Sequence, residues 1–174
     1  MIFTGKEIEK EVDAGRIIID PFEPSHITTN SYDLTLGDSL LRYTEKVLDP
    51  KKNNKYEEIN IAKEGMILPK GSFHLGCSVE RIGSNFCVPI IHARSGMARL
   101  GLFVHVTADL IDIGSIGVTT FQLYATLPIR IYPGMKIAQV SFWQPKGEIE
   151  LYKGKYQNSK SPRASLSYLD KSKF

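Results

Sequence analysis

Side chains that could bind phosphate lie close together in the middle of the chain. Arg94, Ser95 and Arg99 fall within one short stretch. Arginine forms charge-assisted, paired hydrogen bonds with phosphate oxygens, and a serine hydroxyl adds a further donor. Asp112 follows an apolar run and precedes a glycine turn, where a carboxylate could accept a hydrogen bond from a sugar hydroxyl or hold a water molecule. This combination favours phosphate chemistry.

Other kinds of chemistry lack the residues that they need. A zinc deaminase needs a Cys-x-x-Cys pair and a His-x-Glu motif, whereas Cys77 and Cys87 are ten positions apart and no His-x-Glu exists, so no zinc is expected. The chain has neither a P-loop nor a Gly-x-Gly-x-x-Gly motif. Ser95 with His105 could form a nucleophile–base pair, but no Gly-x-Ser-x-Gly elbow surrounds Ser95 and His105 is expected inside a strand. We expect both cysteines to be reduced and buried.

The amino-acid composition limits which classes of protein the chain can belong to. The 174 residues are 42% hydrophobic and 24% charged, which is typical of one globular domain. No apolar run approaches the roughly 20 residues of a membrane span, and the N-terminus lacks a signal-peptide pattern, so the expected compartment is the cytoplasm. Residues 151–174 carry six basic residues against one acid, Asp170. A basic tail suits a small polyanion, and no nucleic-acid-binding motif accompanies it.

The elements that must position these residues are mostly short strands. Thr4 and Glu7 form a capping-box pattern and Gly15 occupies a helix-ending position, which predicts one short helix. From Ile17 onward, Gly and Pro recur every 8–12 positions between runs rich in β-branched and aromatic residues, such as 117–121. This spacing predicts a β-sandwich or barrel. Asp33 lies in an alternating run, and alternation alone favours the solvent face over a buried position.

Four short motifs resemble those of the superfamily that unites dCTP deaminases and trimeric dUTPases: residues 31–34 (SYDL), 94–98 (RSGMA), 110–117 (LIDIGSIG) and 134–139 (GMKIAQ). The N-terminal helix and residues 99–102, 104–108, 132–135 and 154–157 resemble the dCTP deaminase branch. The resemblance covers about residues 4 to 170. It implies an all-β, distorted jelly-roll or β-barrel fold of the dUTPase-like type with a short N-terminal helix. It also implies one domain over residues 1–150 with a basic lid or tail over 151–174, and a homotrimer with sites at subunit interfaces. From the residues alone, 152–161 could equally be a lid or a frayed terminus.

The resemblance also implies a ligand and a set of contacts. The substrate would be dCTP or dUTP with Mg²⁺ held by its phosphates and no protein metal site, and dTTP would be an inhibitor. Arg94, Ser95 and Arg99 would hold phosphates, with Arg99 reaching into a neighbour's site. Thr107 and Ala108 would present backbone groups to the base and the attacking water, and Asp112 would contact the sugar or order the water. Tyr152 and Lys155 would close on the triphosphate, and Ser159 stands where the family's tail usually has a glutamine that contacts the triphosphate.

One departure from the family pattern decides the chemistry. The strand after the Asp112 motif carries a glutamate in dCTP deaminases, which acts as general base and acid, and here that position is Gln122. An amide cannot shuttle a proton, and such catalysis is typically worth about 10²–10⁴-fold. The expected catalytic set is Gln122, Ser95, Asp112 and Ala108.

Three functions stay open. The first is a dCTP deaminase-like hydrolase that converts dCTP and water to dUTP and ammonia, feeding dUMP and dTTP synthesis. The second is a dUTP diphosphatase that releases dUMP and pyrophosphate, which is supported by Gly96 matching the dUTPase form, although the glycine-rich final motif of trimeric dUTPases is absent. The third is a non-catalytic, nucleotide-binding regulatory trimer.

Overall fold

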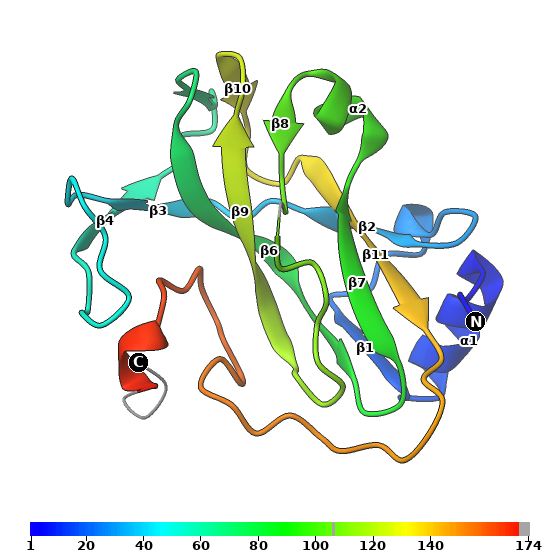
Figure 1. Ribbon diagram of the computed structural model, residues 1–174. Helices are drawn as coiled ribbons and strands as arrows, with labels where there is room; N and C mark the ends of the chain where they lie inside the picture. The colour runs from blue at the N-terminus through cyan, green and yellow to red at the C-terminus, as the bar shows by residue number, and fades with distance from the viewer. Residues whose placement is uncertain (106, 171–174) are drawn as a thin grey trace.

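The computed structural model describes residues 1–105 and 107–170, and its framework is built from β-strands (Figure 1). The strands are β1 (Ile17–Asp20), β2 (Tyr32–Thr35), β3 (Ser39–Tyr43), β4 (Tyr56–Asn60), β5 (Met66–Leu68), β6 (Phe73–Ser84), β7 (Val88–Ala93), β8 (Leu102–Phe103), β9 (Gly117–Ala125), β10 (Ile129–Ile131) and β11 (Lys136–Trp143). The helices are α1 (Gly5–Asp13) and α2 (Ser95–Arg99), with short 3-10 turns η1 (Pro24–His26) and η2 (Ser167–Leu169). The all-β expectation is confirmed.

The strands form two main sheets and one short pair. The larger sheet runs β4-β3-β6-β9-β8, with β1 also paired to β6, and the smaller sheet runs β2-β11-β7. The third sheet is the pair β5 and β10. Sequence-distant strands are neighbours in both larger sheets, as in a jelly roll or barrel, so residues from the middle and the end of the chain share one surface.

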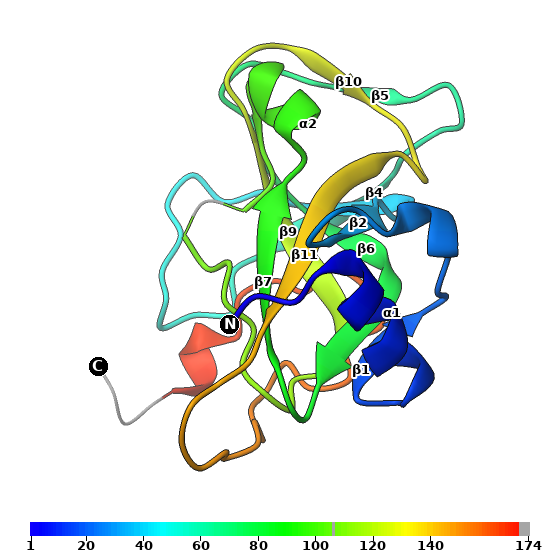
Figure 2. The ribbon, with the colours of Figure 1, turned by 90° about the vertical axis from the view of Figure 1, so that its right-hand side faces the viewer.

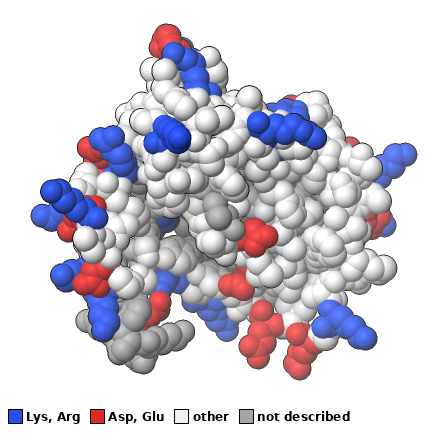
Figure 3. All heavy atoms as spheres, turned by 45° about the horizontal axis from the view of Figure 1, so that its top comes forward, with Lys and Arg blue, Asp and Glu red and all other residues white. Residues whose placement is uncertain are grey.

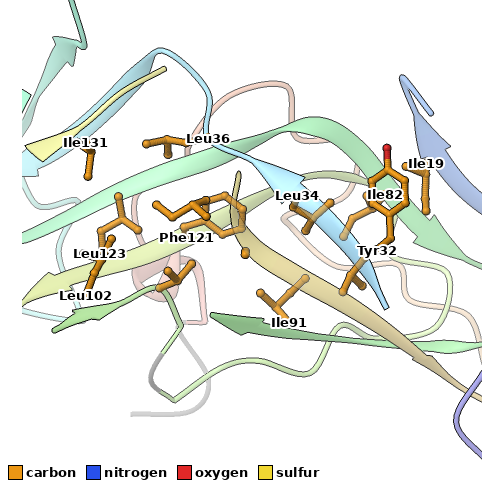
Figure 4. Packing of buried hydrophobic residues seen from close by; sticks show 14 of the residues in the cluster. Ile19, Tyr32, Leu34, Leu36, Ile82, Ile91, Leu102, Phe121, Leu123 and Ile131 are labelled. Atoms are coloured by element: carbon orange, nitrogen blue, oxygen red, sulfur yellow. The ribbon is translucent and has the colours of Figure 1, made fainter. Parts of the chain in front are cut away.

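The hydrophobic core lies between the two larger sheets. Figure 4 shows inward-facing side chains that come from both sheets, among them Leu34, Ile91 and Phe121. Side chains alternate between the two faces of a strand, so one face of each sheet is apolar and the other is available for function. Full burial of each large apolar side chain stabilises the fold by about 1.5–3 kcal/mol, which gives the site a rigid support.

Helix α1 is where predicted, but its N-terminus is held differently. Gly15 follows the helix with φ +69°, as expected of the residue that ends it. Thr4 is the N-cap, but its side chain makes no capping hydrogen bond, so the predicted capping box is wrong. Glu7 instead pairs with Lys10 at 3.1 Å, and the Gly5 amide donates to the Thr29 carbonyl at 2.8 Å. The helix start is therefore fixed by main-chain docking, and Figure 2 shows α1 packed beside β1.

The C-terminal segment, residues 151–170, packs against the rest of the chain. It passes beneath the sheets and rises along the start of β9 (Figure 1). Its main chain joins the body where Tyr152 N donates to Ile113 O at 2.8 Å and Val118 N donates to Ser159 O at 2.9 Å. Farther along, Ser165 N donates to the Tyr43 hydroxyl at 2.8 Å. The frayed-terminus interpretation of residues 152–161 is therefore wrong, whereas the lid function stays a prediction.

Two simpler expectations concern the cysteines and membrane spans. Cys77 and Cys87 are free and buried, as expected. Burial raises the pKa of the Cys77 thiol to about 11, so this group is protonated and unreactive at neutral pH. Over residues 1–105 and 107–170, no helix is long and apolar enough to cross a membrane.

Candidate functional site

A cavity of about 920 Å³ lies between one face of the larger sheet and the C-terminal segment. Six of the predicted site residues line it: Thr107, Ala108, Asp112, Gln122, Tyr152 and Ser159. They come from three separate parts of the chain, namely the connection between β8 and β9, strand β9 itself, and the C-terminal segment. The fold therefore brings together the four residues that the resemblance assigned to the base, water and sugar and two of those that it assigned to the triphosphate, Tyr152 and Ser159.

The floor of the cavity is formed by β6 and β9. Gln122 lies opposite Leu75 in the antiparallel register, and Tyr124 lies opposite Phe73, so all four side chains share one face. Gln122 is half-buried, and its backbone N–H donates to the Val104 carbonyl at 2.8 Å. This bond ties β9 to the chain just before His105. Gln122 is thus one of the few polar side chains on a mostly apolar floor, with Thr120 beside it on the same face.

His105 also lines the cavity, but not as a partner of Ser95. Its ring packs edge-on against Phe121, with ring centroids 6.3 Å apart and planes at 89°. His105 had been expected inside a strand, but β8 ends at Phe103, so His105 lies just beyond that strand. Burial lowers the pKa of the His105 imidazole, which is therefore neutral at pH 7. Ser95 lies on α2 and is absent from the cavity wall, so the disfavoured Ser95–His105 pair does not form.

The turn that carries Asp112 is held by the C-terminal segment. Asp112 is exposed at the cavity, and its carbonyl accepts from Ser115 N at 3.0 Å in a turn whose Gly114 has φ +88°. The Gln157 side chain binds both ends of the bend that follows: it donates to Gly114 O at 2.7 Å and accepts from Ile116 N at 2.8 Å. Sequence reasoning gave Gln157 no role, because a pairing between residues so far apart leaves no local signal.

Two residues of the C-terminal segment use their side chains in contacts within that segment. Ser159 is 7% exposed, and its hydroxyl donates to the Tyr156 carbonyl at 2.8 Å. Lys155 pairs with Asp170 and does not line the cavity. Other side chains that line the cavity were not predicted at all: Tyr43, Phe73, Tyr156 and Arg163. In the sequence, the aromatic residues interleaved with the lysines of the C-terminal segment were the one feature that indicated that this segment lines a binding cavity.

The three predicted phosphate-binding residues at and within α2 lie apart from the cavity. Arg94, Ser95 and Arg99 do not line it, and α2 leaves Ser95 and Arg99 exposed. In Figures 1 and 2, α2 lies at the upper end of the molecule, whereas the C-terminal segment runs along the lower end. One chain alone therefore does not bring its own α2 arginine onto its own cavity.

Asp33 organises the surface beside Arg94. Its carboxylate lies 3.2 Å from Arg94 Nε and 3.6 Å from Lys136 Nζ, and it accepts from Gln139 Nε2 at 3.0 Å. Asp33 is only 3% exposed, so the expectation of a solvent-facing side chain is wrong. Strand alternation correctly directs Asp33 away from the core, but long neighbouring side chains cover it. Lys136 and Gln139, to which the sequence assigned no role, belong to this cluster.

Charge and metal-binding potential are both modest. Figure 3 shows one face of the molecule, on which basic and acidic side chains are interspersed around a largely uncharged middle. Across residues 1–105 and 107–170, no group of three or more His, Cys, Asp or Glu side chains could hold a metal ion. The Asp33 carboxylate is already shared by two cations and an amide. These residues do not fit a resident metal.

The sequence matches known proteins along nearly its whole length. Residues 2–145 match the dCTP deaminase-like family model. A protein named "dCTP deaminase, dUMP-forming" from Hathewaya histolytica is 42% identical over 171 residues, covering 98% of this chain and 99% of that protein. A protein of the same name from Clostridium botulinum is 44% identical, covering 98% of each chain. A "dCTP deaminase" from Rhodopirellula baltica is 40% identical over 97% of this chain and 85% of its own.

The fold has a counterpart among solved structures. The crystal structure of 2'-deoxycytidine 5'-triphosphate deaminase from Agrobacterium tumefaciens superposes with a TM-score of 0.65 at 18% identity. The match covers 81% of this chain but 47% of that one, so this chain corresponds to about half of the longer protein. This similarity supports the dUTPase-like β fold predicted from the sequence.

Proposed function

The chain belongs to the dCTP deaminase-like family, and from this premise we propose that it is a pyrimidine deoxynucleotide hydrolase of the dCTP deaminase type. The observation that carries the proposal is the single cavity that gathers Thr107, Ala108, Asp112, Gln122 and Tyr152 from distant parts of the sequence. A cavity with apolar walls and a few converging polar groups is typical of a small-molecule site. Its apolar floor suits the faces of a pyrimidine ring.

The polar groups divide between the base and the sugar. The base lies against the β6–β9 floor, beside Gln122 and the backbone groups of Thr107 and Ala108. Asp112, exposed at the turn, accepts a hydrogen bond from the deoxyribose hydroxyl, and the Tyr152 ring covers the sugar from the C-terminal segment. This segment serves as a lid, and residues 151–174 form a basic tail to the domain of residues 1–150.

The triphosphate is held by residues of two chains. Arg94, Ser95 and Arg99 lie away from the cavity of their own chain, so in a homotrimer the α2 helix of one subunit serves the cavity of the next. Lys155 exchanges Asp170 for a phosphate oxygen when the lid closes, and Ser159 contributes through its backbone because its hydroxyl is already used. Mg²⁺ arrives with the phosphates, and dTTP competes as an inhibitor for the same site. We place the protein in the cytoplasm.

The proton balance limits the first reaction. Deamination of dCTP adds water at C4, forms dUTP and releases ammonia, and the same group must first remove a proton from the water and then return one to the leaving nitrogen. Gln122 cannot do this, so deamination is slower by about 10²–10⁴-fold than with a carboxylate at this position. Within β9, which the structure describes in full, the Tyr124 phenol is the one other titratable side chain on the face of Gln122, and His105 and Asp112 line the cavity from the connection between β8 and β9.

A second candidate reaction avoids this difficulty. Hydrolysis of dUTP to dUMP and pyrophosphate does not require chemistry at C4, so Gln122 leaves it intact. Gln122 is the specific observation that favours this dUTP diphosphatase activity, and the names of the Hathewaya and Clostridium relatives include "dUMP-forming". The third candidate is a regulatory trimer that binds the nucleotide without reaction.

One assay separates the three. The full chain is incubated with dCTP and, separately, with dUTP in the presence of Mg²⁺, and ammonia and pyrophosphate are followed independently. Pyrophosphate from dUTP without ammonia from dCTP establishes the diphosphatase, and binding of either nucleotide with neither product establishes the regulatory protein. Rapid ammonia release by the unchanged chain contradicts the role given to Gln122. Gln122→Glu is expected to gain ammonia release by about 10²–10⁴-fold if proton transfer is the missing step.

A further inference from the structure

The described wall of the cavity carries one positive and one negative charge. Of the described residues that line it, only Arg163 and Asp112 have a formal charge at pH 7, since burial lowers the pKa of the His105 imidazole and keeps it neutral. Asp112 already has a proposed contact, the deoxyribose hydroxyl. Arg163 has none, because no sequence motif and no step of the proposed function uses it.

The main chain at Arg163 is fixed to the floor of the cavity. Arg163 N donates to the Thr120 hydroxyl at 3.0 Å, and Thr120 lies two residues before Gln122 on the same face of β9. The next residue, Ala164, is 9% exposed and belongs to a small buried apolar cluster with Leu75, the neighbour of Gln122 across the register. Arg163 is therefore held beside the part of the floor on which the base is proposed to lie.

The guanidinium of Arg163 is available to a ligand. The residue is exposed, and its side chain makes no hydrogen bond or ion pair with any residue in 1–105 or 107–170. Lys155 and Arg94, by contrast, already pair with carboxylates of the protein. A guanidinium stays charged at physiological pH, and its paired donors match two oxygens of a phosphate. Arg163 therefore combines an anchored main chain with an unused cation that is suited to an anion in the cavity.

The shape of a nucleotide indicates which anionic group this is. The base, the 3'-hydroxyl and the 5'-phosphate leave the sugar ring in three different directions. With the base beside Gln122 and the hydroxyl at Asp112, the α-phosphate contacts a third part of the wall, and Arg163 is the only cation that the described wall offers. The β- and γ-phosphates extend farther, toward the residues that a second chain supplies.

We propose that Arg163 binds the α-phosphate, so that the cavity of one chain by itself recognises a pyrimidine deoxynucleoside monophosphate. Helix α2 of the neighbouring chain is then required for the β- and γ-phosphates alone. The inference rests on the proposed function, because it requires a nucleotide in the cavity. It extends that function by adding a binding residue and by naming dUMP, the product of the diphosphatase reaction, as a ligand that the cavity retains.

The ligands dUMP and 2'-deoxyuridine, which differ by the phosphate alone, test this inference. Both are titrated into the full chain by calorimetry at pH 8 and low ionic strength. The unchanged chain is expected to bind dUMP about 10–100-fold more tightly than deoxyuridine, as a charge-assisted contact provides. Arg163→Gln keeps the main-chain bond to Thr120, and it should weaken dUMP by about tenfold or more while deoxyuridine stays within about twofold.

Two further variants separate the phosphate contact from a general effect of charge. Arg163→Lys keeps the charge but loses the paired donors, so it should restore part of the affinity for dUMP. Lys160→Gln removes one positive charge from an exposed residue of the same segment that does not line the cavity. It should change the affinity for neither ligand.

Three results overturn the inference but leave the proposed nucleotide site intact. The first is an unchanged preference for dUMP in Arg163→Gln. The second is an equal loss of dUMP and deoxyuridine, which a contact between Arg163 and the base would produce. The third is a chain that binds the α,β-imido analogue of dUTP but not dUMP, since its phosphates would then be held outside the cavity. Failure of all three ligands to bind the unchanged chain overturns the proposed function itself, and the inference with it.

Discussion

Asp33 is buried on the outer face of β2, where its carboxylate is shared by Arg94, Lys136 and Gln139. The cluster carries one negative and two positive charges, so it keeps a surplus of positive charge beside α2. A buried carboxylate that orients an arginine does two things: it stabilises the fold and it fixes where the guanidinium points. Arg94 could otherwise turn away from the surface on which the proposed phosphate binds.

Asp33→Asn tests this positioning role. The substitution keeps the shape but removes the charge, so the free energy of unfolding should fall by about 1–3 kcal/mol. The Kd for the α,β-imido analogue of dUTP, in which a bridging nitrogen blocks release of diphosphate, should rise as well. The reason is that Arg94 loses the carboxylate that orients its guanidinium. Urea unfolding and calorimetry measure the two effects. Asp38→Asn, at an exposed aspartate, is the control and should change neither quantity. A loss of stability with an unchanged Kd would show that Asp33 is structural alone.

His74 is the other residue whose burial makes a definite prediction. It is 2% exposed, and neither ring nitrogen has a partner in the described part of the chain. Burial, followed by the nearby Arg42 charge, lowers the pKa of the imidazole. The unfolded chain therefore takes up a proton at a pH where the folded chain does not. The stability contributed by neutral His74 is present above the ordinary imidazole pKa near 6.5 and is lost as pH falls through that value toward the folded pKa.

Two variants of His74 distinguish titration from the burial of a polar group. His74→Leu should remove this part of the pH dependence between pH 7.5 and 5.5 and should raise stability at pH 7.5 by about 1 kcal/mol, since two unpaired nitrogens are removed. His74→Asn should also remove the pH dependence but without the gain at pH 7.5. Urea unfolding at the two pH values gives the comparison. An unchanged pH dependence in both variants would exclude His74 as its source.

At the scale of elements, the C-terminal segment holds the turn that presents Asp112. Gln157 bonds to Gly114 and Ile116 at opposite sides of that turn, and Gly117 leaves no room for a side chain, because a Cβ there would lie 2.8 Å from Ser159 N. The segment and the start of β9 therefore fit each other closely. Proposed lid closure and the position of Asp112 are coupled through these contacts.

Gln157→Ala should loosen this element without unfolding the sheets. Two hydrogen bonds are lost from a half-buried amide, each worth about 1 kcal/mol, so residues 151–170 should become sensitive to brief proteolysis while the core stays intact. The Kd for the nucleotide analogue should rise in parallel. Mass spectrometry of timed digests locates the cuts. Gln144→Ala, at an exposed glutamine after β11, is the matched control; if it is cut equally fast, the clamp assigned to Gln157 is wrong.

Elements with a strong local signal could be predicted from the sequence, and contacts between distant elements could not. The short helix ending before Gly15 and the strand at residues 117–121 follow from residue type and spacing, and both are confirmed. The capping bond of Thr4 is absent, and the helix start is held instead by the Gly5 amide, which donates to the Thr29 carbonyl of a distant segment. The burial of Asp33 and the clamp made by Gln157 depend on partners roughly 40 to 100 positions away, as the pairing of Asp33 with Gln139 illustrates. No local pattern encodes them.

At the scale of the whole molecule, the proposed site is incomplete in one chain. The cavity carries groups suited to base and sugar, whereas α2, which carries the exposed Arg99, lies at the other end of the same subunit. A triphosphate bound through both sets requires a second copy of the chain. Closed symmetric oligomers supply such a partner at every site, because each interface repeats. The separation between the cavity residues and the α2 residues is therefore a structural argument for the predicted homotrimer.

Complementation between two defective chains tests the shared site. Arg99→Ala removes the proposed phosphate contact but keeps the cavity, and Asp112→Asn removes the proposed sugar contact in the cavity but keeps α2. Each variant alone should lose tight binding of the imido analogue of dUTP. When the two are co-folded at equal amounts, about one quarter of the sites should combine an intact cavity with an intact Arg99 from the neighbouring chain, and these should bind like the unchanged protein. Calorimetric stoichiometry counts them, and light scattering gives the number of chains. A mixture that recovers no tight sites would place Arg99 and Asp112 in the same chain's site, because only sites built within one chain cannot be repaired by a partner.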